Sequence, residues 1–463
     1  MVIGVLASCG LSVSLMQTLV VPLLPQFPRL LNAPTSTVAW LVTATLVAGA
    51  VCAPVLGRLG DMYGKRRMLM VALGLVTVGS ALGAAAPNVE ILIGARVLQG
   101  ASLGVVPLGI SIMRDVLPPQ RVGSAIALMS SSLGIGGAVA LPITGAVAQA
   151  ASWRWLFAGA AVIGVLQLLA VRRMVSESVT RTGGRFDLPG ALGLGAALVC
   201  LLLAISKGSD WGWGSTAVLG LFVASAVLFL LWGRMELRVT SPLVDLRVSA
   251  QPAVLWTNIG SILIGFAMFT GFLVTTQVLQ APVETGYGFG LPLVVAGLAL
   301  LPIGAAMAVF SPVSARLSQR FGARTTLVIG TVVLIAGNLS MASLPDHLAW
   351  VIASATLTAI GAALSYSALP LLIMDAVRPT ETAAANSLNT LMRMLGTSSC
   401  SAVAAAVTSG LTATVAGVTL PSETAYVVVF MAAAGAAAAA TVISAATPAS
   451  RTRQETRELA PAS

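Results

Sequence analysis

Two arginines interrupt long apolar runs of this sequence. Their charged side chains make them the first candidates within these runs for binding a solute. Arg96 precedes Gln99 by three positions, and Arg393 follows Asn386 and Asn389 at helical spacing. Residues three, four and seven positions apart share one face of a helix. A charged side chain inside hydrocarbon costs about 2.5–3.5 kcal/mol on insertion scales, so each arginine should face protein or a water-filled path. The alternative for both is a structural contact with backbone carbonyls or a neighbouring helix.

The composition decides the broad class of the protein. Hydrophobic residues make up 57% of the 463 positions and charged residues 9%, whereas a soluble domain carries about 25% charged residues. That shortage of charge excludes a large soluble enzyme, a disordered chain and a coiled coil. The apolar runs are about 20 residues long and do not alternate as membrane β-strands do. We therefore expect an all-α polytopic membrane protein.

The hydropathy pattern predicts fourteen transmembrane helices. They cover residues 2–24, 37–57, 68–87, 90–112, 122–147, 155–171, 188–206, 215–233, 252–278, 290–312, 325–343, 348–374, 382–409 and 423–445. With the N-terminus in the cytoplasm, 20 of the 25 lysines and arginines fall in the inner loops and tail, and 3 fall in the outer loops. Because basic residues concentrate on the cytoplasmic side of membrane proteins, both termini are predicted to be cytoplasmic.

An internal repeat predicts how these helices are organised. Residues 57–67 read GRLGDMYGKRR and residues 315–325 read ARLSQRFGART, so Gly64 corresponds to Gly322 at an offset of 258 residues. Helices one to six end near residue 171, and the excess offset therefore corresponds to two additional spans. The prediction is a 6+2+6 arrangement with a path between the two halves. Its parts are an N-terminal six-helix bundle (1–171), an inserted two-helix pair (188–233), a C-terminal six-helix bundle (252–445) and a cytoplasmic tail (446–463).

Several motifs resemble those of the major facilitator superfamily, and within it those of the fourteen-span drug/proton antiporters. The segment 57–67 matches the family's signature loop after helix two, with glycine, leucine, aspartate, glycine and a basic cluster. Further matches are RVLQGASLG at 96–104, GAVALPITGA at 137–146, WRWLF at 153–157 and the start of helix seven from Phe186 and Asp187 to Gly190. The match at 137–146 is partial, because Leu141 and Ala146 stand where the family carries glycines.

The resemblance, together with the polar helix faces, indicates three groups of functional residues. A cytoplasmic gating loop, which holds one state and releases on switching, comprises Gly57, Asp61, Gly64, Lys65 and Arg66. The intramembrane coupling or substrate path comprises Arg96, Gln99, Gln17, Asn386, Asn389 and Arg393, and the antiporter-motif helix contributes Gly137, Pro142 and Gly145. The alternatives are a solvated basic turn for the first group and structural contacts or small-residue packing for the others. Gln319 stands at the position of Asp61 in the second half. We therefore expect the gating contact of the second half to differ from that of the first.

The distribution of acidic residues bears on the mechanism. All fifteen acids lie outside the middle of the predicted spans, and the only histidine, His347, lies in an outer loop. Proton coupling needs a group that titrates, whereas arginine stays charged. The central path should therefore be positive or neutral and should favour neutral, zwitterionic or anionic substrates. Asp61, Glu90 and Asp375 remain the candidate peripheral proton carriers.

The leading hypothesis is a secondary-active transporter, namely a proton-coupled exporter of small hydrophobic compounds or drugs that acts by alternating access in a bacterial cell membrane. The alternative is a metabolite importer or facilitator, because a fold alone does not set direction. A non-transporting sensor would need a longer soluble segment, and an enzyme is not expected, since no nucleophile motif or metal cluster occurs. The expected partners are a small-molecule substrate and the lipid bilayer, with no nucleic acid, obligatory protein partner, metal or cofactor. The expected energy source is the proton gradient.

Overall fold

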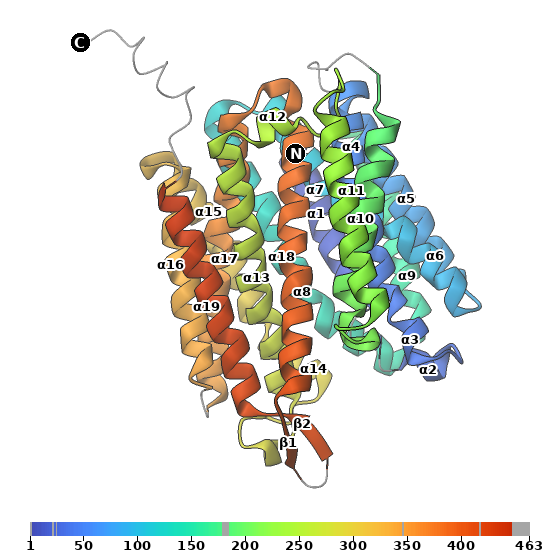
Figure 1. The fold of residues 1–463 in the computed structure, drawn as a ribbon, viewed down its shortest axis with the longest axis vertical. Helices are drawn as coiled ribbons and strands as arrows, with labels where there is room; N and C mark the ends of the chain where they lie inside the picture. The colour runs from blue at the N-terminus through green and yellow to red at the C-terminus, as the bar shows by residue number, and fades with distance from the viewer. Residues whose placement is uncertain are drawn as a thin grey trace.

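Long helices running side by side make up almost the whole of the described chain (Figure 1). The computed structural model describes residues 2–20, 23–24, 26–177, 185–344, 347–415 and 418–446. Of the predicted cytoplasmic tail, 446–463, only Ala446 is among the described residues.

The first part of the chain forms one set of packed helices. These are α1 (Val2–Thr18), the short α2 (Phe27–Leu30) and α3 (Thr35–Val38), α4 (Trp40–Tyr63), α5 (Lys65–Ala85), α6 (Val89–Gln99), the 3-10 turn η2 (Gly100–Gly104), α7 (Val105–Val116), α8 (Pro119–Ala150) and α9 (Arg154–Met174). Helix α1 packs against α8 and α9, and α5 packs against α9. The predicted fourth span therefore consists of α6, η2 and α7 in direct succession.

Two helices follow and pair with each other: α10 (Leu188–Trp211) and α11 (Thr216–Glu236). Helix α10 also packs against α4 and against α18 (Thr382–Gly410). The pair thus lies beside the place where α4 and α18 meet.

The remaining elements form the second set. They are α12 (Leu246–Ser249), α13 (Pro252–Gln280), the 3-10 turn η3 (Val283–Thr285), α14 (Leu293–Ala299), α15 (Leu301–Phe321), α16 (Ala323–Ala342), α17 (Leu348–Ala376), the 3-10 turn η4 (Pro379–Glu381), α18, the strands β1 (Thr412–Val415) and β2 (Val418–Pro421), and α19 (Glu423–Ala446). The two strands form an antiparallel hairpin in which Thr412 pairs with Pro421. Helix α16 packs against α17 and α19, and α13 packs against α18 and α19.

Twelve helices of the described chain are long and apolar enough to cross a membrane. Each of the fourteen predicted spans coincides with at least one helix. Of the two that fall outside the twelve, α1 has 17 residues, and α18 has 29 residues but carries a row of polar side chains. The fourteen-span count therefore stays a prediction.

The repeated segments adopt the same backbone turn. Gly64 has a φ of 118° and Gly322 a φ of 90°, a region that favours glycine because it has no Cβ. Each glycine ends one helix with a 3.0 Å hydrogen bond, from Gly64 N–H to Gly60 O and from Gly322 N–H to Ser318 O, and the next helix begins directly after it.

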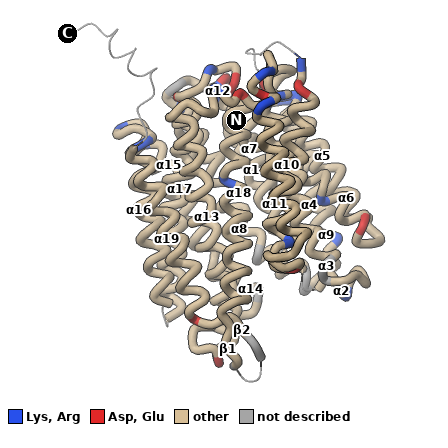
Figure 2. The backbone as a smooth tube through the Cα atoms, viewed as in Figure 1, with Lys and Arg blue, Asp and Glu red and all other residues tan. Residues whose placement is uncertain are grey.

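Two groups of helix contacts join the two sets: α18 packs against α4 and α7, and α8 packs against α14, α15 and α17. Charged positions lie towards the ends of most helices, and Figure 2 shows that most basic positions gather at the end of the bundle near α12. The contacts of functional interest are found where the joining helices reach this charged end.

Candidate functional site

Asp61 connects the two sets of helices. It lies in the last turn of α4 with no exposed surface. Its Oδ2 accepts a hydrogen bond from Ala384 N–H at 2.8 Å, and its Oδ1 accepts one from Ala383 N–H at 3.3 Å, in the first turn of α18. The first backbone N–H groups of a helix lack partners within the helix, and the helix dipole favours an anion there. Asp61 therefore caps a helix that lies 323 residues further along the chain.

Lys65 is buried beside Asp61, and its positive charge balances the negative charges of two carboxylates. Its Nζ lies 2.8 Å from Asp115 Oδ2 on α7 and 3.8 Å from Asp61 Oδ1. Lys65 and Asp61 are both fully buried, and a buried charge is stable only when it is paired. The expectation of a loop needs correction, because Asp61 lies in the last turn of α4, Lys65 begins α5, and Gly64 alone turns between the two helices. The alternative of a solvated turn is wrong for these two side chains.

Arg66 contacts residues of its own set. Its backbone N–H donates to Glu177 Oε1 at 3.0 Å, and its Nη2 donates to Arg172 O at 2.5 Å. Arg67 N–H donates to the second oxygen of Glu177 at 3.2 Å. These bonds fix the start of α5 to the end of α9, so Arg66 does not belong to the contact between the two sets.

Gly57 allows α4 and α18 to approach closely. A methyl group at this position would lie 2.8 Å from Ala383 O and would collide with the Ser387 side chain. Real Cβ atoms essentially never come within 3.0 Å of such an atom. The absence of a side chain at Gly57 is therefore a condition for the contact that Asp61 makes one turn later.

The second set makes a related but weaker contact. Gln319, which corresponds to Asp61 in the repeat, donates from Nε2 to Gln120 O in the first turn of α8 at 3.1 Å. This bond is exposed and neutral, whereas the Asp61 contact is buried and charged. The asymmetry expected from the sequence is thus visible as a carboxylate on one side and an amide on the other.

Arg96 is enclosed within the first set of helices. It is 2% exposed, and its Nε donates to Leu41 O at 3.0 Å. Its Nη1 donates to Met16 O at 3.0 Å and to Gln99 Oε1 at 2.7 Å. The guanidinium therefore ties α6 to α1 and α4 through backbone carbonyls, and this geometry favours the structural alternative for Arg96.

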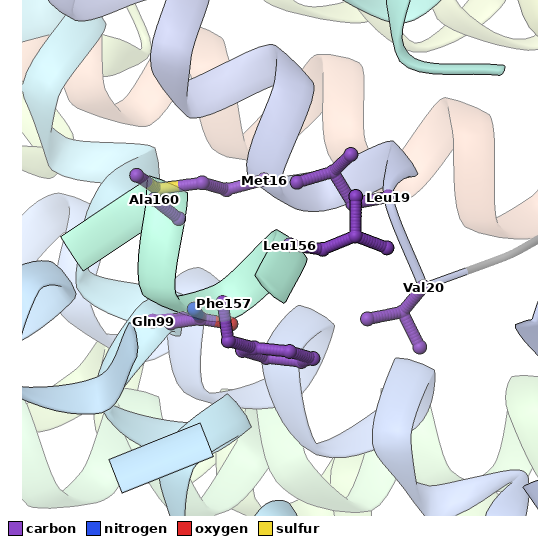
Figure 3. Close-up of a pocket in the computed structure, with 7 residues that line it drawn as sticks. All are labelled: Met16, Leu19, Val20, Gln99, Leu156, Phe157 and Ala160. Carbon is purple, nitrogen blue, oxygen red and sulfur yellow. The ribbon is translucent and has the colours of Figure 1, made fainter. Parts of the chain in front are cut away.

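Gln99 continues this network towards a small apolar cavity. Its Nε2 donates to Ser80 Oγ on α5 at 2.9 Å. The cavity holds about 10 Å³, room for at most one water molecule, and Figure 3 shows its lining: Met16, Leu19, Val20, Gln99, Leu156, Phe157 and Ala160. The predicted site residue Gln17 is half-buried on α1. The structure brings Gln99 and Arg96 together, and the cavity that the described residues form beside Gln99 is too small for a substrate.

Arg393 lies between α17 and α18 in the second set. Its guanidinium stacks on the ring of Tyr366 at 5.0 Å, and its Nη1 donates to Asn389 Oδ1 at 3.2 Å. Asn389 Nδ2 donates to Asn258 Oδ1 and Ser261 Oγ on α13. The predicted polar face therefore joins α13, α17 and α18.

Asn386 takes no part in this network. Its Nδ2 donates to Thr382 O within α18 at 2.9 Å. Of the second group of predicted residues, the structure thus brings Arg96 together with Gln99 and Arg393 with Asn389, in two separate networks.

The antiporter-motif residues lie on α8, which contacts both sets of helices. Pro142 stands inside this 32-residue helix. A methyl group at Gly137 would meet Ser14 of α1 at 3.8 Å, and one at Gly145 would lie 2.7 Å from Val294 of α14. Gly145 therefore permits close packing on α14, whereas 3.8 Å is an ordinary van der Waals distance, so the contact with α1 leaves room for a methyl group at Gly137. The side chain of Leu141, the departure noted in this motif, lies outside the described part of the structure.

A cavity of about 460 Å³ lies between the two sets at the charged end. Its lining comes from α7 and α8 on one side and from α15, α16 and α17 on the other: Arg114, Leu117, Val122, Gly123, Ala315, Ser318, Gln319, Ala323, Leu371, Met374 and Asp375. It combines an apolar wall with one cation and one anion, and its size suits a small organic molecule.

Sequence reasoning missed Arg114 as a residue of this cavity. A signal was present, since Ile112-Met113-Arg114 and Ile373-Met374-Asp375 match at an offset of 261 residues, close to the offset of the main repeat. Equivalent positions of the two halves thus carry opposite charges and line the same cavity.

The described acids occupy the end regions of helices or the connections between them. Arg96 lies in the last turn of α6, inside the continuous span formed by α6, η2 and α7, and Arg393 lies well inside α18. No group of three His, Cys, Asp or Glu side chains that could hold a metal ion occurs among the described residues. The charge distribution expected from the sequence therefore holds for the part of the chain that is described.

Comparisons of the sequence and of the fold with known proteins point to the same group of proteins. The sequence pattern of the Major Facilitator Superfamily matches residues 6–401. The chain is 26% identical to Multidrug resistance protein 3 of Bacillus subtilis over 77% of this chain and 70% of that protein. It is 28% identical to the Tetracenomycin C resistance and export protein of Streptomyces glaucescens over 72% of this chain and 61% of that protein. The fold is similar to the crystal structure of the human organic anion transporter MFSD10, with a TM-score of 0.68, 18% identity and coverage of 96% and 98% of the two chains.

Proposed function

The chain belongs to the major facilitator superfamily and is a multi-pass membrane transporter, and on this premise we propose that it exports small hydrophobic compounds or drugs from a bacterial cell in exchange for protons. Relatives named for multidrug resistance and antibiotic export support this direction of transport. The membrane would be the bacterial cell membrane.

The proposed architecture has fourteen spans in a 6+2+6 arrangement with both termini in the cytoplasm. Its support is that helices lie at every predicted span and that basic residues concentrate at one end of the bundle, as they do on the cytoplasmic side of membrane proteins. In this orientation, Asp61, Lys65 and the 460 Å³ cavity lie at the cytoplasmic end.

The observation that carries the proposal is the capping of α18 by Asp61. Alternating access needs contacts between two halves that exist in one state and break in the other. The two hydrogen bonds of the Asp61 cap and the Gln319 bond connect the halves at one end of the joining helices. The Lys65 ion pairs neutralise Asp61 from within the first half. Breaking the bonds between the halves would let their cytoplasmic ends separate, and Gly57 would no longer be pressed against α18.

The proposed substrates are neutral, zwitterionic or anionic. The acids in the described chain lie towards the ends of helices or between them, and Arg393 supplies a buried positive charge. The cytoplasmic cavity presents Arg114 and Asp375 together, which suits a solute that carries both charges or none. A multivalent cation would find no carboxylate deep in the described helices.

Proton exchange would use carboxylates at the cytoplasmic end. Asp61 and Asp115 share Lys65, so adding a proton to either would weaken the contact that holds the halves together. Arg96 would support the first half as a structural residue, since its donors bind the carbonyls of two other helices.

The test is accumulation of a panel of compounds in cells that lack their own exporters. The panel contains dicationic, neutral, zwitterionic and anionic members, each measured with and without an uncoupler. We expect the wild type to lower the accumulation of neutral or anionic members, the uncoupler to abolish the effect and Asp61→Ala to lose it at equal membrane abundance. Strong export of the dicationic members would refute the charge preference, and increased accumulation would refute export in favour of import.

A further inference from the structure

A second pair of acids lies away from the contact between the halves, at the charged end of α10 and α11. Asp187 precedes α10, and Glu236 is the last residue of α11. Asp187 is 9% exposed and Glu236 is 2% exposed. The two carboxyl groups contact each other, and a methyl group at Gly190 would touch Asp187 Oδ2 and lie 2.7 Å from Glu236 Oε2. The two oxygens therefore converge on one spot.

One oxygen of each acid has a clear structural partner. Asp187 Oδ1 accepts a hydrogen bond from Gly190 N–H at 2.8 Å and so caps the start of α10. Glu236 Oε1 accepts one from Val244 N–H at 2.8 Å and so holds the segment that follows α11. The other oxygens, Asp187 Oδ2 and Glu236 Oε2, are buried and accept no hydrogen bond from any described residue.

Two facing carboxylate oxygens without a donor are unfavourable if both groups are ionised. Like charges in contact raise the free energy, and each unpaired buried oxygen adds a desolvation cost. A single proton removes both problems, because a protonated carboxyl group donates a hydrogen bond that the other oxygen accepts. A metal ion is less suited, since hard cations take six or more oxygen ligands, and no third acid joins the pair among the described residues.

No basic side chain among the described residues neutralises the two carboxylates through an ion pair. The charged residues on the segments around the pair are Arg185, Arg234, Arg238, Asp245 and Arg247, with Arg58 and Asp61 on α4 and Arg393 on α18. Lys207 and Asp210 lie at the opposite end of α10 and pair with each other. None of them forms an ion pair with Asp187 or Glu236 within the described residues.

We infer that Asp187 and Glu236 form a proton-binding site in which one proton is shared between Asp187 Oδ2 and Glu236 Oε2. The proton joins the start of α10 to the end of α11. It also keeps Leu243 and Val244 in the apolar cluster that contains Ala50 of α4 and Leu391 of α18. Loss of the proton places two negative charges in contact and loosens the attachment of the helix pair to both halves.

The test combines infrared spectroscopy with thermal unfolding of the full-length protein in detergent. Asp187→Asn and Glu236→Gln keep the oxygen that caps Gly190 or Val244 and replace the shared proton by an amide N–H donor. We expect the wild type to show a protonated-carboxyl infrared band at neutral pH that both variants lose. We expect its melting temperature to fall between about pH 5 and about pH 9, above the ordinary carboxyl pKa of about 4. In both variants that downward shift should be absent.

The direction follows from linkage. A proton that the folded protein holds above the ordinary carboxyl range stabilises the fold at low pH, and its contribution is lost as the pH rises. Asp245→Asn is the matched control, because the side chain of Asp245 caps α12 by accepting hydrogen bonds from Arg247 N–H and Val248 N–H. This variant should keep both the band and the pH dependence.

Several results would overturn the inference. The first is a band that survives in both variants. The second is a melting curve whose pH dependence is the same in all four proteins. The third is stabilisation of the wild type by calcium or magnesium that a chelator reverses, since this would assign the site to a metal. If one variant fails to fold, the band in the other decides the question. None of these readouts requires transport, so the result is independent of the proposed function.

Discussion

Replacing Asp61 by alanine removes the strongest contact between the two halves and should shift the transporter towards a state that is open to the cytoplasm. Two backbone N–H groups of α18 lose their acceptor, while Lys65 keeps its 2.8 Å contact with Asp115. A hydrogen bond to a charged group contributes about 1.5–3 kcal/mol net. Taking the lower value for both bonds gives about 3 kcal/mol, and since 1.4 kcal/mol corresponds to a factor of ten, the shift is about one hundred-fold.

The assay is a distance distribution between spin labels at Arg121 and Arg320, which are exposed on opposite sides of the Gln319 contact. The labels are placed in a chain whose four cysteines have been replaced. We expect a long-distance population to become dominant in Asp61→Ala. Asp61→Asn keeps an acceptor but loses the charge and should give an intermediate shift.

The matched control is Gln319→Ala, which removes one neutral and exposed hydrogen bond worth about 0.5–1.5 kcal/mol. Its shift should stay below about tenfold. A distance distribution in Asp61→Ala that equals the wild type, with the same transport rate, would refute the assignment of Asp61 as the residue that holds the halves together.

Three further predictions follow from the same contacts. Gly57→Ala places a methyl group 2.8 Å from Ala383 O, and such overpacking between α4 and α18 costs about 1–3 kcal/mol. The spin-label distances should therefore lengthen as in Asp61→Ala, and unchanged distances would show that the helices adjust locally. Arg96→Met removes three hydrogen bonds from a charged donor. If at least two of them each contribute about 1.5 kcal/mol to the free energy of unfolding, the melting temperature should drop clearly; loss of transport with an unchanged melting temperature would instead place Arg96 in the substrate path. Arg393→Gln removes the buried charge that stacks on Tyr366 and should reduce export of anionic compounds more than of neutral ones, and equal reductions in the same accumulation assay would count against the charge argument.

The sequence was informative wherever a property depends on neighbours along the chain. Runs of about 20 apolar residues predict helices because the backbone must satisfy its own hydrogen bonds in lipid, and helices lie at all of the predicted spans. The repeat of Gly64 and Gly322 predicted a common turn, because only glycine adopts its positive φ readily. The scarcity of acidic residues within the spans could likewise be predicted, because it depends only on the positions of these residues along the chain.

Partners across helices could not be predicted in the same way. The spacing of Arg96 and Gln99 places them on one helical face, but only the packing of α1 and α4 around that face turned the arginine towards two backbone carbonyls. The polar face of α18 was predicted as a cavity lining or an interhelical contact, and the position of α13 directs Asn389 into a contact. Spacing fixes a direction relative to the helix axis, whereas the crossing of helices decides what lies in that direction.

The sequence by itself thus determined the class of protein, its helices, its repeat and its membership of a transporter family. The tertiary structure alone decided that Asp61 caps a helix 323 residues away, that Lys65 is buried between two carboxylates and that Asp187 meets Glu236. The physical reason is the range of the forces involved. Helix formation and hydropathy are local to a few turns of chain, whereas hydrogen bonds and charge pairs act over a few ångströms between segments that only folding brings together.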